Sequence, residues 1–254
     1  MTEGSARVTG RHLAAGMHHR AVATNEGLRP WPRLRDTWWV FGLAAAALGI
    51  FLLGFLVALR CGPRGCDGSL ATRLLDLDAV GGIPRLFTTA LFVGSAFLAW
   101  RASRSAGGGA AMWWTAVAVI ATGFAVAKVA SVHSTLKNSL SPLVTLVGGL
   151  ALTGLALGAL WMTGRRWGVA ATRPVVLAFA AYAVVALGLD LLTGLAAAVQ
   201  DRVGWLTVSG TTFVEELGEA LAALVLLVTI RWHVTRRSPV ARTLVAGGLS
   251  DRVG

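Results

Sequence analysis

Six ionisable side chains lie inside or beside long apolar segments, where their chemistry would be unusual. They are Lys128, His133, Asp190, Glu215, Glu216 and Glu219. Placing a charged aspartate or lysine at the centre of a bilayer costs about 2.5 to 3.5 kcal/mol on insertion scales. We therefore expect these groups to face one another or a water-filled cavity. All lie in the same half of their segments, so they can converge on one outward-facing acidic cleft.

The three glutamates cannot all point the same way from one helix. Glu219 shares a helical face with residues three or four positions earlier, whereas Glu215 and Glu216 are adjacent. Thr212-x-x-Glu215 is a capping-box pattern, which predicts a helix start near Thr212 with Glu215 in its first turn. Glu216, Glu219 and Asp190 are then the carboxylates expected to carry function.

Three functions fit this set of side chains. The first is proton- or cation-coupled passage, in which crowded carboxylates exchange protons with the outer solution and Lys128 serves as an internal counter-charge. The second is a structural or accessory subunit of a membrane complex, in which Lys128 neutralises one carboxylate and hydrogen bonds hold the others. The third is an intramembrane hydrolase, in which the carboxylates and His133 hold a divalent metal that activates water.

The carboxylates and histidine resemble the layout of transmembrane hydrolases that hold zinc between helices. That resemblance implies metal ligation by Asp190, Glu216, Glu219 and His133, although the paired histidines of those enzymes are missing here. The chain contains no Walker loop, Gly-x-Ser-x-Gly elbow or His-Glu-x-x-His motif. The sequence therefore leaves enzymatic activity open, and the one cofactor under consideration is the divalent metal that this resemblance implies.

The two cysteines, Cys61 and Cys66, follow the first apolar segment in the stretch Cys-Gly-Pro-Arg-Gly-Cys. Pro63 and the glycines permit a tight turn. The spacing is neither a redox Cys-x-x-Cys motif nor a zinc pair. We expect a structural disulfide on the outer face, which would stabilise this short loop by roughly 2 kcal/mol.

The elements that must position these groups are long apolar segments. Hydrophobic residues make up 55% of the chain and charged residues only 14%, which is typical of a membrane protein. The sequence predicts an all-α, polytopic transmembrane bundle of about six spans. The segments are 38–59, 86–100, 111–131, 143–163, 174–199 and 211–232. Segment 86–100 is short for a crossing and must borrow residues near Pro84.

The basic residues predict the orientation of these spans. With both termini in the cytoplasm, the inner segments hold 16 of the 23 lysines and arginines. The net charge of +11 is thus explained by topology rather than by nucleic acid binding. The abundance of arginine, alanine and glycine is typical of a GC-rich bacterial genome. We expect a multi-pass protein of the bacterial inner (cell) membrane.

Other patterns concern the layout of the chain. We expect a cytoplasmic tail over 1–37, a membrane domain over 38–232 and a basic tail over 233–254. The expected partner is the lipid bilayer, and the sequence leaves open a second copy of the chain or another membrane protein. Leu70–Val80 predicts a short amphipathic helix on the outer leaflet. Tryptophans at segment ends predict interface anchors, and Gly154-x-x-x-Gly158 predicts close helix packing. Those tryptophans are Trp38, Trp39, Trp100, Trp113, Trp114, Trp161 and Trp232.

Overall fold

The structure is a computed structural model that describes residues 37–62, 68–77, 79, 81–130 and 142–235. Within these residues the chain forms helices and no strand. The helices are α1 (Trp38–Cys61), α2 (Leu70–Leu75), α3 (Ile83–Ser105), α4 (Gly108–Val129), α6 (Pro142–Arg166), α7 (Thr172–Ala198), α8 (Gln200–Val203) and α9 (Trp205–Thr235).

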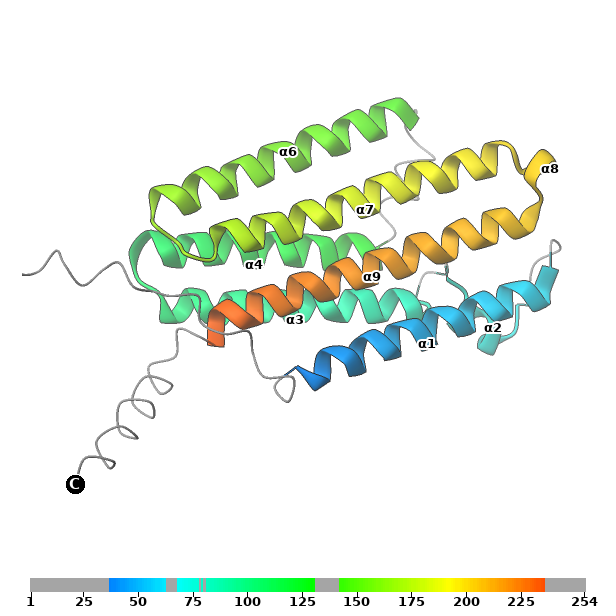
Figure 1. Ribbon diagram of the computed structural model, residues 1–254, viewed down its shortest axis with the longest axis horizontal. Coiled ribbons are helices and arrows are strands. Elements are labelled where there is room, and N and C mark those ends of the chain that lie inside the picture. The colour runs from blue at the N-terminus through cyan, green and yellow to red at the C-terminus, as the bar shows by residue number, and fades with distance from the viewer. Residues whose placement is uncertain (1–36, 63–67, 78, 80, 131–141, 236–254) are drawn as a thin grey trace, which may run out of the picture. The chain divides into compact units, whose positions relative to one another are not determined.

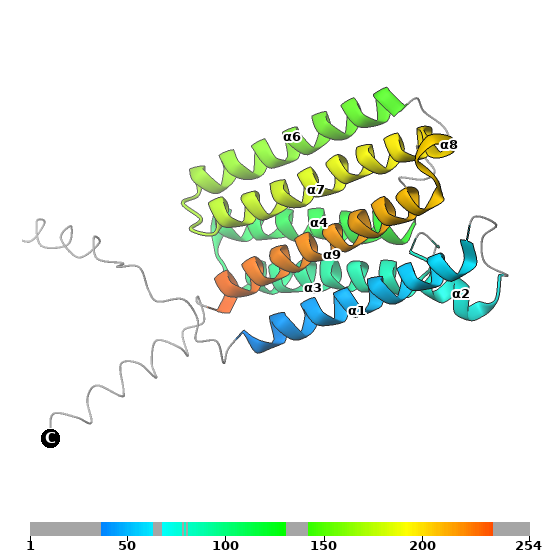
Figure 2. The same ribbon diagram turned by 45° about the vertical axis from the view of Figure 1, so that its right-hand side comes forward.

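The long helices α1, α3, α4, α6, α7 and α9 alternate in direction along the chain (Figures 1 and 2). We call one end of the bundle the basic end, because Arg101, Arg104, Arg165, Arg166, Arg173 and Arg231 lie near it. The opposite end, where α2 and α8 lie, is the acidic end. Every acidic residue in the described part of the chain lies in the half nearer to it.

Five helices are long and apolar enough to cross a membrane: α1, α3, α4, α7 and residues Val147–Arg166 of α6. The predicted all-α membrane bundle is therefore confirmed. The sixth predicted span corresponds to α9, which carries three glutamates and is not among the five. At 31 residues it is about 46 Å long, and it packs between α3 and α7.

The second predicted span is longer than its apolar residues suggested. Helix α3 begins at Ile83, with Pro84 in its first turn, and continues to Ser105. Proline is well suited to a first helical turn because it lacks the N–H that would have no partner there. The resulting 23 residues suffice for a crossing and bring Arg85 into the span.

The core at the basic end contains two tryptophans that we expected at the lipid interface. Trp113 and Trp114 are completely buried, and the Trp113 indole donates a hydrogen bond to the carbonyl of Leu160 at 2.9 Å. Gly164 makes this packing possible, because a Cβ there would lie 2.6 Å from Trp113 Nε1 and would also clash with Thr172. The predicted position at the lipid interface was therefore wrong for Trp113 and Trp114. Trp38, in contrast, is 71% exposed.

The glycines expected to bring helices together do not do so. A Cβ on Gly154 or Gly158 would meet no atom within 4 Å, so neither residue faces a neighbouring helix. A motif of two small residues permits close approach, but the rotation of α6 about its own axis turns these positions away from α7.

The predicted amphipathic helix is shorter than Leu70–Val80. Ser69 caps α2, whose last residue is Leu75, and the following Asp76 is extended. Leu77 lies beyond the helix and is buried in a small cluster with Ala47 and Phe51. Gly54 of α1 allows this contact, because a Cβ there would lie 2.6 Å from the Leu75 carbonyl oxygen. The segment therefore packs against α1.

Candidate functional site

Helix α9 presents two carboxylates to the interior of the bundle. Glu216 and Glu219 are three residues apart and lie on one helical face, with only 6% and 7% of their surfaces exposed. Small buried residues, Ala220 and Ala223, continue the buried surface of this helix. Carboxylates this deeply buried require partners, because water no longer solvates them.

Lys128, in the last turn of α4, provides the principal partner for both carboxylates. Its Nζ lies 2.7 Å from Glu219 Oε2, and it donates hydrogen bonds to the two Glu216 oxygens at 3.1 and 3.2 Å. Helical side chains lean toward the N-terminus of their helix. A lysine near the acidic end of α4 can therefore reach back into the bundle toward the middle of α9.

Tyr182 of α7 also contacts Glu219. Its hydroxyl donates a hydrogen bond to Glu219 Oε2 at 3.1 Å, and the residue is 4% exposed. The rings of Phe92 and Phe124 meet the tyrosine ring edge to face at 4.9 and 5.0 Å. This aromatic packing between α3, α4 and α7 fixes where the hydroxyl points.

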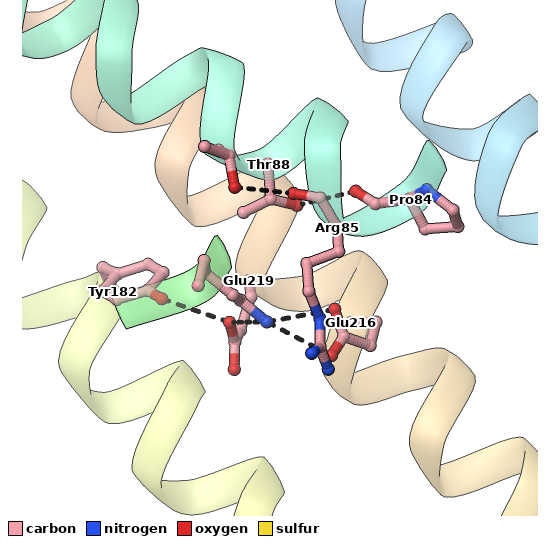
Figure 3. A network of polar contacts seen from close by, with 8 residues as sticks. Pro84, Arg85, Thr88, Tyr182, Glu216 and Glu219 are labelled. Atoms are coloured by element: carbon pink, nitrogen blue, oxygen red, sulfur yellow. Dashed lines mark hydrogen bonds and ion pairs between the residues drawn. The ribbon is translucent and has the colours of Figure 1, made fainter. Parts of the chain in front are cut away.

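A second buried cation comes from the start of α3. Arg85 is 5% exposed, and its guanidinium is directed toward Glu216, with which it interacts favourably (Figure 3). We call Arg85, Lys128, Tyr182, Glu216 and Glu219 the buried ionic network. With its acids and bases ionised, it holds two negative and two positive charges. The buried ionic network is thus balanced in charge rather than acidic.

Of the other predicted site residues, Asp190 lies on α7 and Glu215 on α9, whereas His133 falls outside the described residues. Asp190 is half-buried, and its charge interacts with that of Glu215, which also interacts with those of Glu216 and Glu219. Cys66 also falls outside the described residues, whereas Cys61 ends α1. The described part of the chain contains no group of three or more His, Cys, Asp or Glu side chains disposed to hold a metal.

The capping interpretation of Glu215 was wrong. Helix α9 begins at Trp205, so Glu215 lies almost three turns inside it. The Thr212 hydroxyl donates to the carbonyl of Val208 at 3.0 Å instead of capping a helix end. The predicted span began at Thr211 because the residues before it alternate between polar and apolar. The helix itself starts six residues earlier, at Trp205.

Sequence reasoning missed Arg85 and Tyr182. Tyr182 is the only tyrosine of the chain and stands in an otherwise apolar segment, which was a usable signal. Arg85 comes directly before the apolar segment 86–100, so hydropathy alone leaves it outside the second span. Its role depends on α3 starting at Ile83, which hydropathy did not indicate.

The helices and their buried network define a multi-pass α-helical membrane protein with an ionic interior. No protein family model, curated protein or solved structure matches the chain.

Proposed function

We propose that this protein passes protons or small cations across the membrane, with Glu216 and Glu219 as the exchange site. The observation that carries the proposal is the sharing of one ammonium group between two buried carboxylates, at 2.7 Å from Glu219 and 3.1 Å from Glu216. Such a lysine is an internal counter-charge that an incoming cation can replace.

The exchange changes the partners of Lys128. When a proton or cation binds to Glu219, that carboxylate no longer needs Lys128, and the ammonium pairs with Glu216 alone. When the ion leaves, Lys128 returns to both. The Tyr182 hydroxyl donates to the same Glu219 oxygen, so it can follow that group through both states. With two negative and two positive charges in the network, the ion-free state is balanced and the ion-bound state carries one net positive charge. The bound state is therefore the costlier one, which favours release of the ion.

The proposal also includes the membrane in which the protein resides and its orientation there. We infer that α9 is the sixth span, that the basic end faces the cytoplasm of a bacterium, and that the protein resides in its inner membrane. Cys61 and Cys66 then lie on the oxidising side, where a disulfide between them is stable.

Flux in liposomes tests this function. Purified protein is reconstituted with a pH-sensitive dye inside the vesicles, and a potassium diffusion potential drives cation entry. Wild-type protein should acidify the interior or, with a cation-sensitive dye, admit the cation. Glu219→Gln should insert and fold normally yet fall to the rate of protein-free vesicles. The matched control is Asp201→Asn on exposed α8, which should retain the wild-type rate.

A structural or accessory role is the second candidate, and the charge balance of the network favours it. The network joins side chains of α3, α4, α7 and α9. In that role, wild-type protein would show no flux above empty vesicles, and Glu219→Gln would instead lower the unfolding temperature or the yield of an assembled complex. The same pair of proteins therefore separates the two functions.

A further inference from the structure

The outer surface of α3 carries a shallow groove at the basic end. It has a volume of about 420 Å³ and is lined by Phe97, Trp100, Arg101, Arg104 and Ser105. This size falls within the range of pockets that hold small ligands. The groove is on a different face and at the opposite end of the bundle from the start of α3, where Arg85 joins the buried ionic network.

The two arginines give this groove a positive charge. The Arg101 guanidinium lies 6.0 Å from the centre of the Phe97 ring, and that of Arg104 lies 5.2 Å from the Trp100 ring. These contacts hold both cations at the groove. Within the described residues, the ion pairs join Lys128 to Glu216 and Glu219, and none involves either arginine. Guanidinium groups match phosphate well in shape and charge.

Below the arginines, the same face of α3 is apolar and turned outward. Val93, Phe97 and Trp100 recur at helical spacing and are 54%, 51% and 46% exposed. In a membrane helix, such a stripe contacts lipid tails, whereas the arginines at its end lie at headgroup level. We propose that the groove binds an anionic phospholipid of the leaflet at the basic end, with its phosphate on Arg101 and Arg104 and an acyl chain along Phe97 and Val93.

Native mass spectrometry of the full-length protein in detergent tests this proposal, with phosphatidylglycerol and phosphatidylcholine offered separately. Wild-type protein should retain phosphatidylglycerol preferentially. Arg101→Gln/Arg104→Gln should bind it about 30-fold more weakly, the scale expected when two basic contacts to an anionic lipid are lost. Arg104→Gln alone, which keeps one arginine for membrane topology, should show a smaller loss in the same direction.

The matched control is Arg165→Gln/Arg166→Gln, a second exposed arginine pair at the basic end that does not line the groove. This variant should bind phosphatidylglycerol as the wild type does. Equal losses in the two double variants would show general charge attraction and overturn the proposal. Equal binding of the two lipids would also overturn it, as would complete displacement of the lipid by soluble glycerol phosphate, which would indicate a free phosphate as the ligand.

Discussion

Lys128 serves two carboxylates with one ammonium group, so its loss should have a larger effect than the loss of a surface ion pair. Lys128→Met leaves Glu216 and Glu219 buried, with Arg85 as the remaining cation directed toward them. We expect destabilisation of about 3 to 5 kcal/mol, the usual result of breaking a buried pair on one side. Unfolding in detergent, followed by tryptophan fluorescence, measures this change.

A compensating substitution distinguishes ion pairing from simple loss of packing. Adding Glu219→Gln to Lys128→Met removes one of the stranded charges, so the double variant should be more stable than the sum of the single effects predicts. Arg202→Met on exposed α8 is the control and should change stability little. Strict additivity of the two network substitutions would contradict the proposed coupling.

Among individual residues, the sequence predicted part of the buried ionic network. Lys128, Glu216 and Glu219 stand out because charges are costly in apolar segments, and the structure brings them together. The placement of Asp190 beside Glu215 was not predictable in the same way. It depends on how α7 and α9 are rotated about their own axes, which is set by side-chain packing between helices rather than by hydropathy.

The contact between α1 and the segment after α2 depends on Gly54, which has no side chain. Gly54→Ala should displace Leu75 and Leu77 from α1 and cost about 1 to 3 kcal/mol, as overpacking usually does. Gly49→Ala on the same helix is the control, because a Cβ there meets no atom within 4 Å. Thermal unfolding of the two variants checks this prediction, and equal effects would argue against the contact.

Helices were easier to predict than their ends or their contacts. Long apolar runs identified α1, α3, α4, α6 and α7, because few other structures accommodate such runs. The ends of helices differed from the predicted ends by several residues where polar residues continue the helix. Helix α9, for example, begins at Trp205 rather than at Thr211. The glycine motif in α6 failed because close packing requires a partner helix on the correct side.

The charge asymmetry between the two ends of the molecule predicts that the basic end faces the cytoplasm. Labelling of single cysteines tests this orientation. In a background of Cys61→Ser and Cys66→Ser, single cysteines replace Gly107 at the basic end and Gln200 at the acidic end, both exposed. A membrane-impermeant maleimide added to intact cells should label Gln200→Cys, whereas Gly107→Cys should react only after permeabilisation. The reverse pattern would place the buried ionic network nearer the cytoplasm.

The pairing of α4 with α9 also has a consequence for biosynthesis. Lys128 precedes Glu216 by 88 residues, so at typical synthesis rates α4 leaves the ribosome about 4 to 18 s before its partner carboxylates exist. Lys128 is the penultimate residue of α4, and a long cationic side chain at a helix end can extend to the membrane surface. The nascent chain can therefore hold this charge in water until the last helix arrives and draws it into the interior.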